Sequence, residues 1–150
     1  MTAAPRDCAT RKGDALALLA TPAIDVWVAT ASPDGAPYLV PLSLAWVDGA
    51  AVIALATSSR TARNLGEGGT ARLAVGPTRD VVMIDAVVER RVAVDDDPAL
   101  GAAYVAQADW DPRGEPGYEL VVLRPVRVQA WREANEIPGR TLMRDGRWLD

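Results

Sequence analysis

The densest group of residues able to do chemistry lies in TSSRTARN, residues 57–64, which follows an apolar run. Hydroxyl side chains and two arginines crowd into these positions. A serine before a short helix can cap its first amides, and the remaining free N–H groups with a nearby arginine favour an anion such as phosphate. A capped helix with arginines in solvent gives the same pattern and is slightly favoured by this stretch alone. The neighbouring segments must therefore decide between the two.

Length, charge and composition exclude several function classes. The chain has 150 residues, 49% of them hydrophobic, and a net charge of −4. Such a chain supports one domain with a core, and its charge argues against nucleic acid or an anionic membrane as a partner. Histidine is absent and Cys8 is the single cysteine, so we predict no metal site, no disulfide and no histidine base. No apolar run approaches the roughly 20 residues of a membrane span, and we expect a cytoplasmic protein.

Most of the remaining chain is predicted to form strands. Two Asp-Gly pairs, at 34–35 and 48–49, separate apolar segments and predict a meander of antiparallel hairpins. Pro125 predicts a bulge or an edge position within the last long strand. The expected strands cover residues 26–32, 36–47, 50–57, 70–76, 81–94 and 118–133, and the tail contains a further Asp-Gly turn.

Three short helices are predicted beside these strands. One covers residues 14–20, one lies within 58–67, and one begins at Asp95-Asp96-Asp97-Pro98, where consecutive carboxylates are better explained as a helix start than as a metal site. We expect a single domain in which residues 1–23 form an N-terminal helical segment and residues 24–150 form the barrel. Antiparallel strands with few helices predict a mainly β fold, a closed or split antiparallel barrel.

The order of these motifs resembles the flavin-binding split barrels, which include pyridoxamine 5'-phosphate oxidase and the deazaflavin (F-420)-dependent oxidoreductases. The resemblance rests on DGAPYLVPLSLAW, AVIALAT, SSRTARNL, TARLAVG and a late VQAW followed by arginines, and it covers most of residues 24–148. It implies a homodimeric split β-barrel with the cofactor at the subunit interface. The cofactor would be FMN or, alternatively, coenzyme F-420, and the reaction a two-electron hydride transfer to a small organic substrate.

The resemblance also assigns a cofactor site. It places the phosphate on Ser59 and Arg60, the ring against residues 40–43, and a tryptophan of the partner subunit, here Trp131, on the cofactor. Thr61 stands where the oxidases carry a lysine. No residue is assigned a catalytic role. The cofactor-binding residues implied in this way are Val40, Pro41, Leu42, Ser43, Thr57, Ser58, Ser59, Arg60, Thr61, Asn64, Trp131 and Arg140.

Two alternatives belong to other classes. One is a barrel that stores or senses a cofactor without turnover, although the lack of histidine argues against haem. The other is a cofactor-free barrel used for dimerisation or ligand binding. Trp27, Trp46 and Trp110 are predicted to fill the core or an interface, because phenylalanine is absent. Arg79 and Asp80 are predicted to form a local ion pair.

Overall fold

A computed structural model describes residues 3–150, which form a nine-stranded sheet with three α-helices and two 3₁₀ turns. The elements in chain order are α1 (Cys8–Leu19), β1 (Asp25–Ala31), β2 (Pro37–Ser43), β3 (Ala45–Val47), β4 (Ala50–Ala56), α2 (Arg60–Leu65), β5 (Thr70–Val75), β6 (Val81–Ala93), η1 (Val94–Asp96), α3 (Pro98–Gln107), β7 (Tyr118–Trp131), η2 (Ala134–Glu136), β8 (Thr141–Arg144) and β9 (Arg147–Trp148).

The sheet is antiparallel and does not close. Its strand order is β2-β1-β5-β6-β7-β4-β3, with β8 and β9 attached to β7. The two predicted hairpins form as β1–β2 and β3–β4. The single strand predicted over 36–47 is wrong, because the chain leaves the sheet at Leu44, a fully buried residue whose amide donates to the Ile24 carbonyl. Strands β2 and β3 therefore lie at opposite edges, and the fold is the split antiparallel barrel expected from the sequence.

The main core lies inside the barrel, and a smaller one lies beneath α3. Along β1 the exposed and buried residues alternate, as expected for a strand with one face toward a core. Strand β4 is buried on both faces, since Ile53 joins the main core while Val52 packs in the cluster of Tyr104. Helix α1 contributes the fully buried Leu19 to the main core.

Two local predictions are confirmed. Helix α3 begins where expected, with the Asp97 carboxylate accepting from the Leu100 amide at 3.0 Å and Pro98 in the first turn. Asp95 accepts from the amide of Gly114, so this carboxylate also serves local structure. At Pro125 the pairing of β7 with β6 shifts register, which is the predicted bulge. Its strand is central rather than at an edge.

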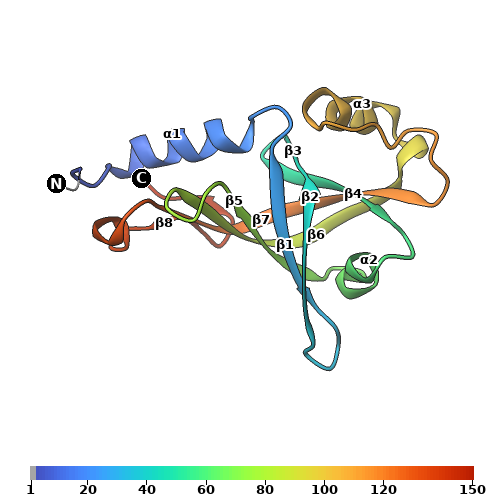
Figure 1. The fold of residues 1–150 in the computed structure, drawn as a ribbon, viewed down its shortest axis with the longest axis horizontal. Helices are drawn as coiled ribbons and strands as arrows, with labels where there is room; N and C mark the ends of the chain where they lie inside the picture. Colours follow the sequence, from blue (N-terminus) through green and yellow to red (C-terminus); the bar gives the residue numbers. More distant parts are fainter. Residues whose placement is uncertain (1–2) are drawn as a thin grey trace.

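The molecule has two distinct ends (Figure 1). Helices α2 and α3 lie at one end, while α1, β8 and the C-terminus lie at the other, and β7 runs between them. Within residues 3–150, no helix combines the length and apolar character that crossing a membrane requires.

An ion network surrounds Glu136 at the α1 end. This residue is 3% exposed, and its carboxylate accepts from Nε and Nη2 of Arg6 at 3.0 and 2.7 Å. These bonds lower the pKa of Glu136 from 4.5 to about 2. The predicted local pair of Arg79 and Asp80 is wrong, since Arg79 pairs with Glu133 and Asp80 pairs with Arg132.

We expect Glu136 to stabilise the fold in a pH-dependent way. A carboxyl whose pKa is lowered by folding contributes fully above its unfolded pKa, and the contribution is lost as the pH falls through its folded pKa. The melting temperatures of wild type and Glu136→Gln should therefore differ near neutrality and converge between pH 4.5 and about 2. Glu133→Gln, at an exposed ion pair with Arg79, is the control with little effect. A difference that persists unchanged to low pH would contradict this assignment.

Candidate functional site

A pocket of about 500 Å³ lies where the barrel is split, between the edge strand β2 and strand β4. The start of α2, the loop after α3 and the first residue of β7 complete its walls. The pocket is lined by Tyr38, Val40, Pro41, Leu42, Ser43, Ala54, Leu55, Ala56, Ser59, Thr61, Trp110 and Tyr118. The failure of the sheet to close thus creates a site that joins segments distant in sequence.

This pocket brings together six of the residues that the sequence assigned to a cofactor. Residues 40–43 supply the β2 wall, and Ser59 and Thr61 supply hydroxyl groups from the start of α2. Within residues 3–150, strand β2 forms hydrogen-bonded pairs with β1 alone, so its other edge has no strand neighbour there. Such an edge leaves backbone donors and acceptors free for a ligand.

The start of α2 places a cation and free donors beside the pocket. The Ser59 hydroxyl accepts from the Ala62 amide at 3.1 Å, which confirms Ser59 as the helix cap. The amides of Arg60 and Thr61 have no acceptor within the described part of the chain. The exposed guanidinium of Arg60 lies 5.3 Å from the ring centroid of Tyr38, a pocket residue. This arrangement can accept an anionic group at the pocket margin.

Among the predicted residues around α2, Arg60 lies at the pocket margin without lining it, and Thr57, Ser58 and Asn64 do not line it either. The Ser58 carbonyl accepts from the Arg63 guanidinium, and the Asn64 amide group donates to the Thr30 hydroxyl on β1 at 3.1 Å. Asn64 therefore ties α2 to the sheet. A role for these three residues in binding a cofactor stays a prediction.

A partly buried ion pair that the sequence did not indicate fixes the other end of α2. Arg91 on β6 donates to the carbonyl oxygens of Ala62 and Gly66 at 3.1 and 2.7 Å. It also pairs with Glu119 on β7, which is 9% exposed. Carbonyl oxygens at the end of a helix lack donors within the helix, and the Arg91 guanidinium supplies donors for two of them. The pair therefore holds α2 against β6 and β7, next to the pocket.

Two aromatic residues form a further wall of the pocket, and sequence reasoning assigned neither to the site. The rings of Trp110 and Tyr118 meet edge to face, with centroids 5.4 Å apart. Trp110 Nε1 donates to the Tyr104 hydroxyl at 3.0 Å. Burial raises the pKa of Tyr104 to about 12, so this phenol stays neutral. Trp110 packs against the smaller core cluster, as predicted, and it also lines the pocket, which the sequence reasoning did not assign to it. The available signal was its position in a polar loop.

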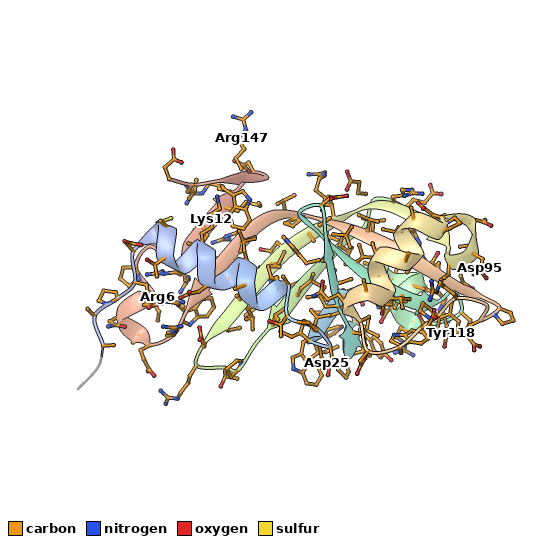
Figure 2. The ribbon with its side chains drawn as sticks, turned by 90° about the horizontal axis from the view of Figure 1, so that it is seen from above. Arg6, Lys12, Asp25, Asp95, Tyr118 and Arg147 are labelled. Carbon is orange, nitrogen blue, oxygen red and sulfur yellow. The ribbon has the colours of Figure 1, made fainter. Side chains whose placement is uncertain are left out.

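Trp131 and Arg140 lie together but far from this pocket. The Arg140 guanidinium is 5.4 Å from the ring centroid of Trp131. Trp131 ends the 14-residue strand that begins at Tyr118, and a fully extended strand of this length spans at most about 40 Å, at about 3.3 Å per residue. Figure 2 has Tyr118 at one end of the molecule and Arg6, on the α1 side, at the other. One copy of the chain therefore cannot bring the pocket residues and the Trp131–Arg140 pair to the same small ligand.

Comparison with known proteins agrees with this architecture. Residues 17–132 match the sequence model of the family described as pyridoxamine 5'-phosphate oxidase. A search of curated proteins finds no significant match. An F420 reductase structure is similar with a TM-score of 0.60 and 23% identity, covering 75% of this chain and 93% of that one.

Two further solved structures share the fold at lower identity. A heme binding protein from Mycobacterium smegmatis has a TM-score of 0.67 and 20% identity, covering 96% of this chain and 60% of that one. A pyridoxamine 5'-phosphate oxidase-related, FMN binding protein from Nostoc punctiforme has a TM-score of 0.55 and 16% identity, covering 82% and 78%. The split barrel, its pocket and the match over most of the sequence agree, and the chain belongs to the pyridoxamine 5'-phosphate oxidase family.

Proposed function

We propose that the chain is a homodimeric oxidoreductase that binds FMN or the deazaflavin F-420 and transfers a hydride to a small organic substrate. The observation that carries this proposal is the pocket at the split of the barrel, where β2 meets the start of α2. Family membership and the similarity to an F420 reductase and an FMN binding protein support a flavin-type cofactor. The cytoplasmic location stays a prediction from the sequence.

The residues present fit a phosphorylated flavin or deazaflavin. Arg60 and the free amides of residues 60–61 supply charge and donors for a phosphate. Residues 40–43 offer an edge-strand wall for a flat ring, and Trp110 with Tyr118 offers aromatic surfaces for a ring or a substrate. When bound, the cofactor supplies the hydride chemistry. The chain's part is to bind, orient and exclude water, for which no histidine is required.

A second copy of the chain would complete the site. Trp131 and Arg140 are too far from the pocket of their own chain, so in this proposal they reach the pocket of the partner subunit. The outer face of the β1–β2 hairpin supports dimerisation, since Trp27 is 50% exposed and Leu39 is 59% exposed. Exposed large apolar side chains of this kind are typical of contact surfaces.

The decisive test is a side-by-side titration of the apo-protein with FMN and with F-420, followed by tryptophan and cofactor fluorescence. We expect saturable binding of one of them at micromolar concentrations or below. Repeating the titration at decreasing protein concentration, with the mass measured by light scattering, tests the shared site. Affinity should fall as the dimer dissociates. Equal affinity in a confirmed monomer would contradict the shared site, and binding of neither cofactor would contradict the proposed function.

A non-catalytic binding protein is the second candidate. The similarity to a heme binding protein extends over 96% of this chain, more than that to the F420 reductase. Storage or sensing would follow if the loaded protein were not reduced by any nicotinamide or deazaflavin donor. Haemin added to the same titration provides the comparison. The sequence offers no histidine to bind haem iron, so we expect flavin or deazaflavin to bind more tightly.

A further inference from the structure

A buried cation in α1 holds the loop that joins β7 to β8. Arg11 is 4% exposed. Its Nη1 donates to the carbonyl oxygens of Ala130, Glu136 and Gly139 at 3.3, 3.0 and 3.0 Å. Burying a guanidinium is costly unless hydrogen bonds compensate for lost water. An apolar side chain would fill the same space without that cost, so what distinguishes arginine here is its hydrogen bonds to backbone carbonyls. Three of these carbonyls lie in or next to the loop, and one, 3.1 Å from Nη2, belongs to Arg6.

The loop held by Arg11 begins and ends at the two residues expected to reach the partner's cofactor. Its base is closed by the Ala130 amide, which donates to the Arg140 carbonyl at 3.0 Å. The Arg140 guanidinium then lies over the ring of Trp131. Arg11 therefore bonds to Ala130, which precedes Trp131, and to Gly139, which precedes Arg140. These two bonds fix the path of the backbone between Trp131 and Arg140.

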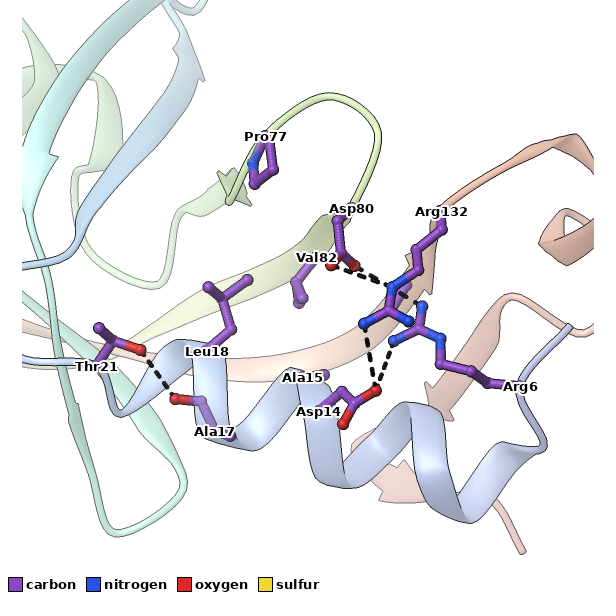
Figure 3. A pocket seen from close by; sticks show the side chains of 11 residues that line it. Arg6, Asp14, Ala15, Ala17, Leu18, Thr21, Pro77, Asp80, Val82 and Arg132 are labelled. Atoms are coloured by element: carbon purple, nitrogen blue, oxygen red, sulfur yellow. Dashed lines mark hydrogen bonds and ion pairs between the residues drawn. The ribbon is translucent and has the colours of Figure 1, made fainter. Parts of the chain in front are cut away.

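A surrounding ion network ties this loop to the rest of the chain (Figure 3). Arg132 pairs with Asp80 at 3.1 Å and lies 3.6 Å from Asp14 of α1, which also pairs with Arg6. Glu136, within the loop, pairs with Arg6 and lies 3.7 Å from Nε of Arg11. The side chains of α1 and of the segment before it thus hold the loop from several directions.

We infer that Arg11 is a positioning residue for the cofactor site of the partner subunit, acting through the loop that carries Trp131 and Arg140. The inference rests on the proposed function. Arg11 touches neither the cofactor nor the pocket of its own chain. Its effect is to preset the geometry of two groups that must enter a pocket on another copy. A loop that is already ordered loses less conformational entropy when it binds, so its binding is tighter.

The test compares Arg11→Lys with the wild-type protein. Lysine keeps the charge but lacks the planar fork that reaches several carbonyls at once. We expect the dissociation constant for the cofactor identified above to rise about tenfold, as for loss of one charge-assisted interaction. In a Trp131→Ala/Arg140→Ala background the same substitution should have little effect, because residues acting through each other are non-additive. Lys12→Met, one position along α1, is the control whose affinity stays unchanged.

Hydrogen–deuterium exchange of the apo-protein gives a readout that needs no cofactor. Amides in residues 131–140 should lose protection in Arg11→Lys, while those of β1 and β5 keep theirs. Additive losses of affinity, or unchanged exchange in the loop, would overturn the positioning role. If the wild-type protein binds no cofactor, the proposed function and the role in positioning fail together, whereas the exchange result still decides whether Arg11 orders the loop.

Discussion

Replacing Arg91 with alanine should lower the free energy of unfolding by about 1.5–3 kcal/mol, the effect of removing a charge-assisted bond from a largely buried carboxylate. Glu119 is 9% exposed and pairs with Arg91 inside the sheet. The substitution also removes the donors to the carbonyls of Ala62 and Gly66. The second loss falls on α2, which lies beside the pocket, so the variant should also bind cofactor more weakly. Denaturant unfolding, followed by tryptophan fluorescence, measures the change.

Two further variants separate the buried pair from a general charge effect. Arg90→Ala removes the neighbouring arginine, whose side chain is half exposed in its pair with Asp97, and should cost much less than Arg91→Ala. Arg91→Met combined with Glu119→Gln removes both charges and should be more stable than Arg91→Ala alone. Equal losses in Arg90→Ala and Arg91→Ala would show that burial of the pair is not the cause.

The hairpins of this fold are predictable because their signals are local. Asp48 and Gly49 adopt φ values of 50° and 77°, as the tight turn between β3 and β4 requires, and an Asp-Gly pair tolerates them. The order of strands depends instead on pairings such as β1 with β5 and β4 with β7, which join distant segments. The break at Leu44 also depends on tertiary packing, because nothing in an apolar run of sequence marks which residue enters the core.

In the candidate site, too, the residues that lie in local motifs are predictable and those that depend on tertiary contacts are not. Residues 40–43 and Ser59 are predictable because each lies in a contiguous motif of the family, and the structure places them on one pocket. The role of Arg91 depends on a distant partner, Glu119. The role of Trp110 depends on Tyr104 of α3 and on the strands that complete the pocket. In the sequence Arg91 belongs to an ordinary charged stretch. Only the packing reveals that its guanidinium ends a helix beside the pocket.

Replacing Arg60 with alanine should weaken cofactor binding by about 1–3 kcal/mol, or roughly 5- to 150-fold, as for a lost charge-assisted contact to phosphate. Arg60 is exposed at the pocket margin, over Tyr38, so its removal should leave the melting temperature nearly unchanged. The titration that identifies the cofactor measures the effect. Its salt dependence should also decrease in the variant, because a screened charge pair has been removed.

Arg63→Ala is the matched control for this substitution. Arg63 lies on the same short helix and is also exposed, but its guanidinium bonds to the Ser58 carbonyl, whereas that of Arg60 lies over Tyr38 of the pocket. Equal losses from both variants would indicate a general effect of positive charge near α2. An unchanged dissociation constant in Arg60→Ala would remove Arg60 from the site. A loss confined to Arg60→Ala would locate the phosphate at the start of α2, where the chain presents its free amides.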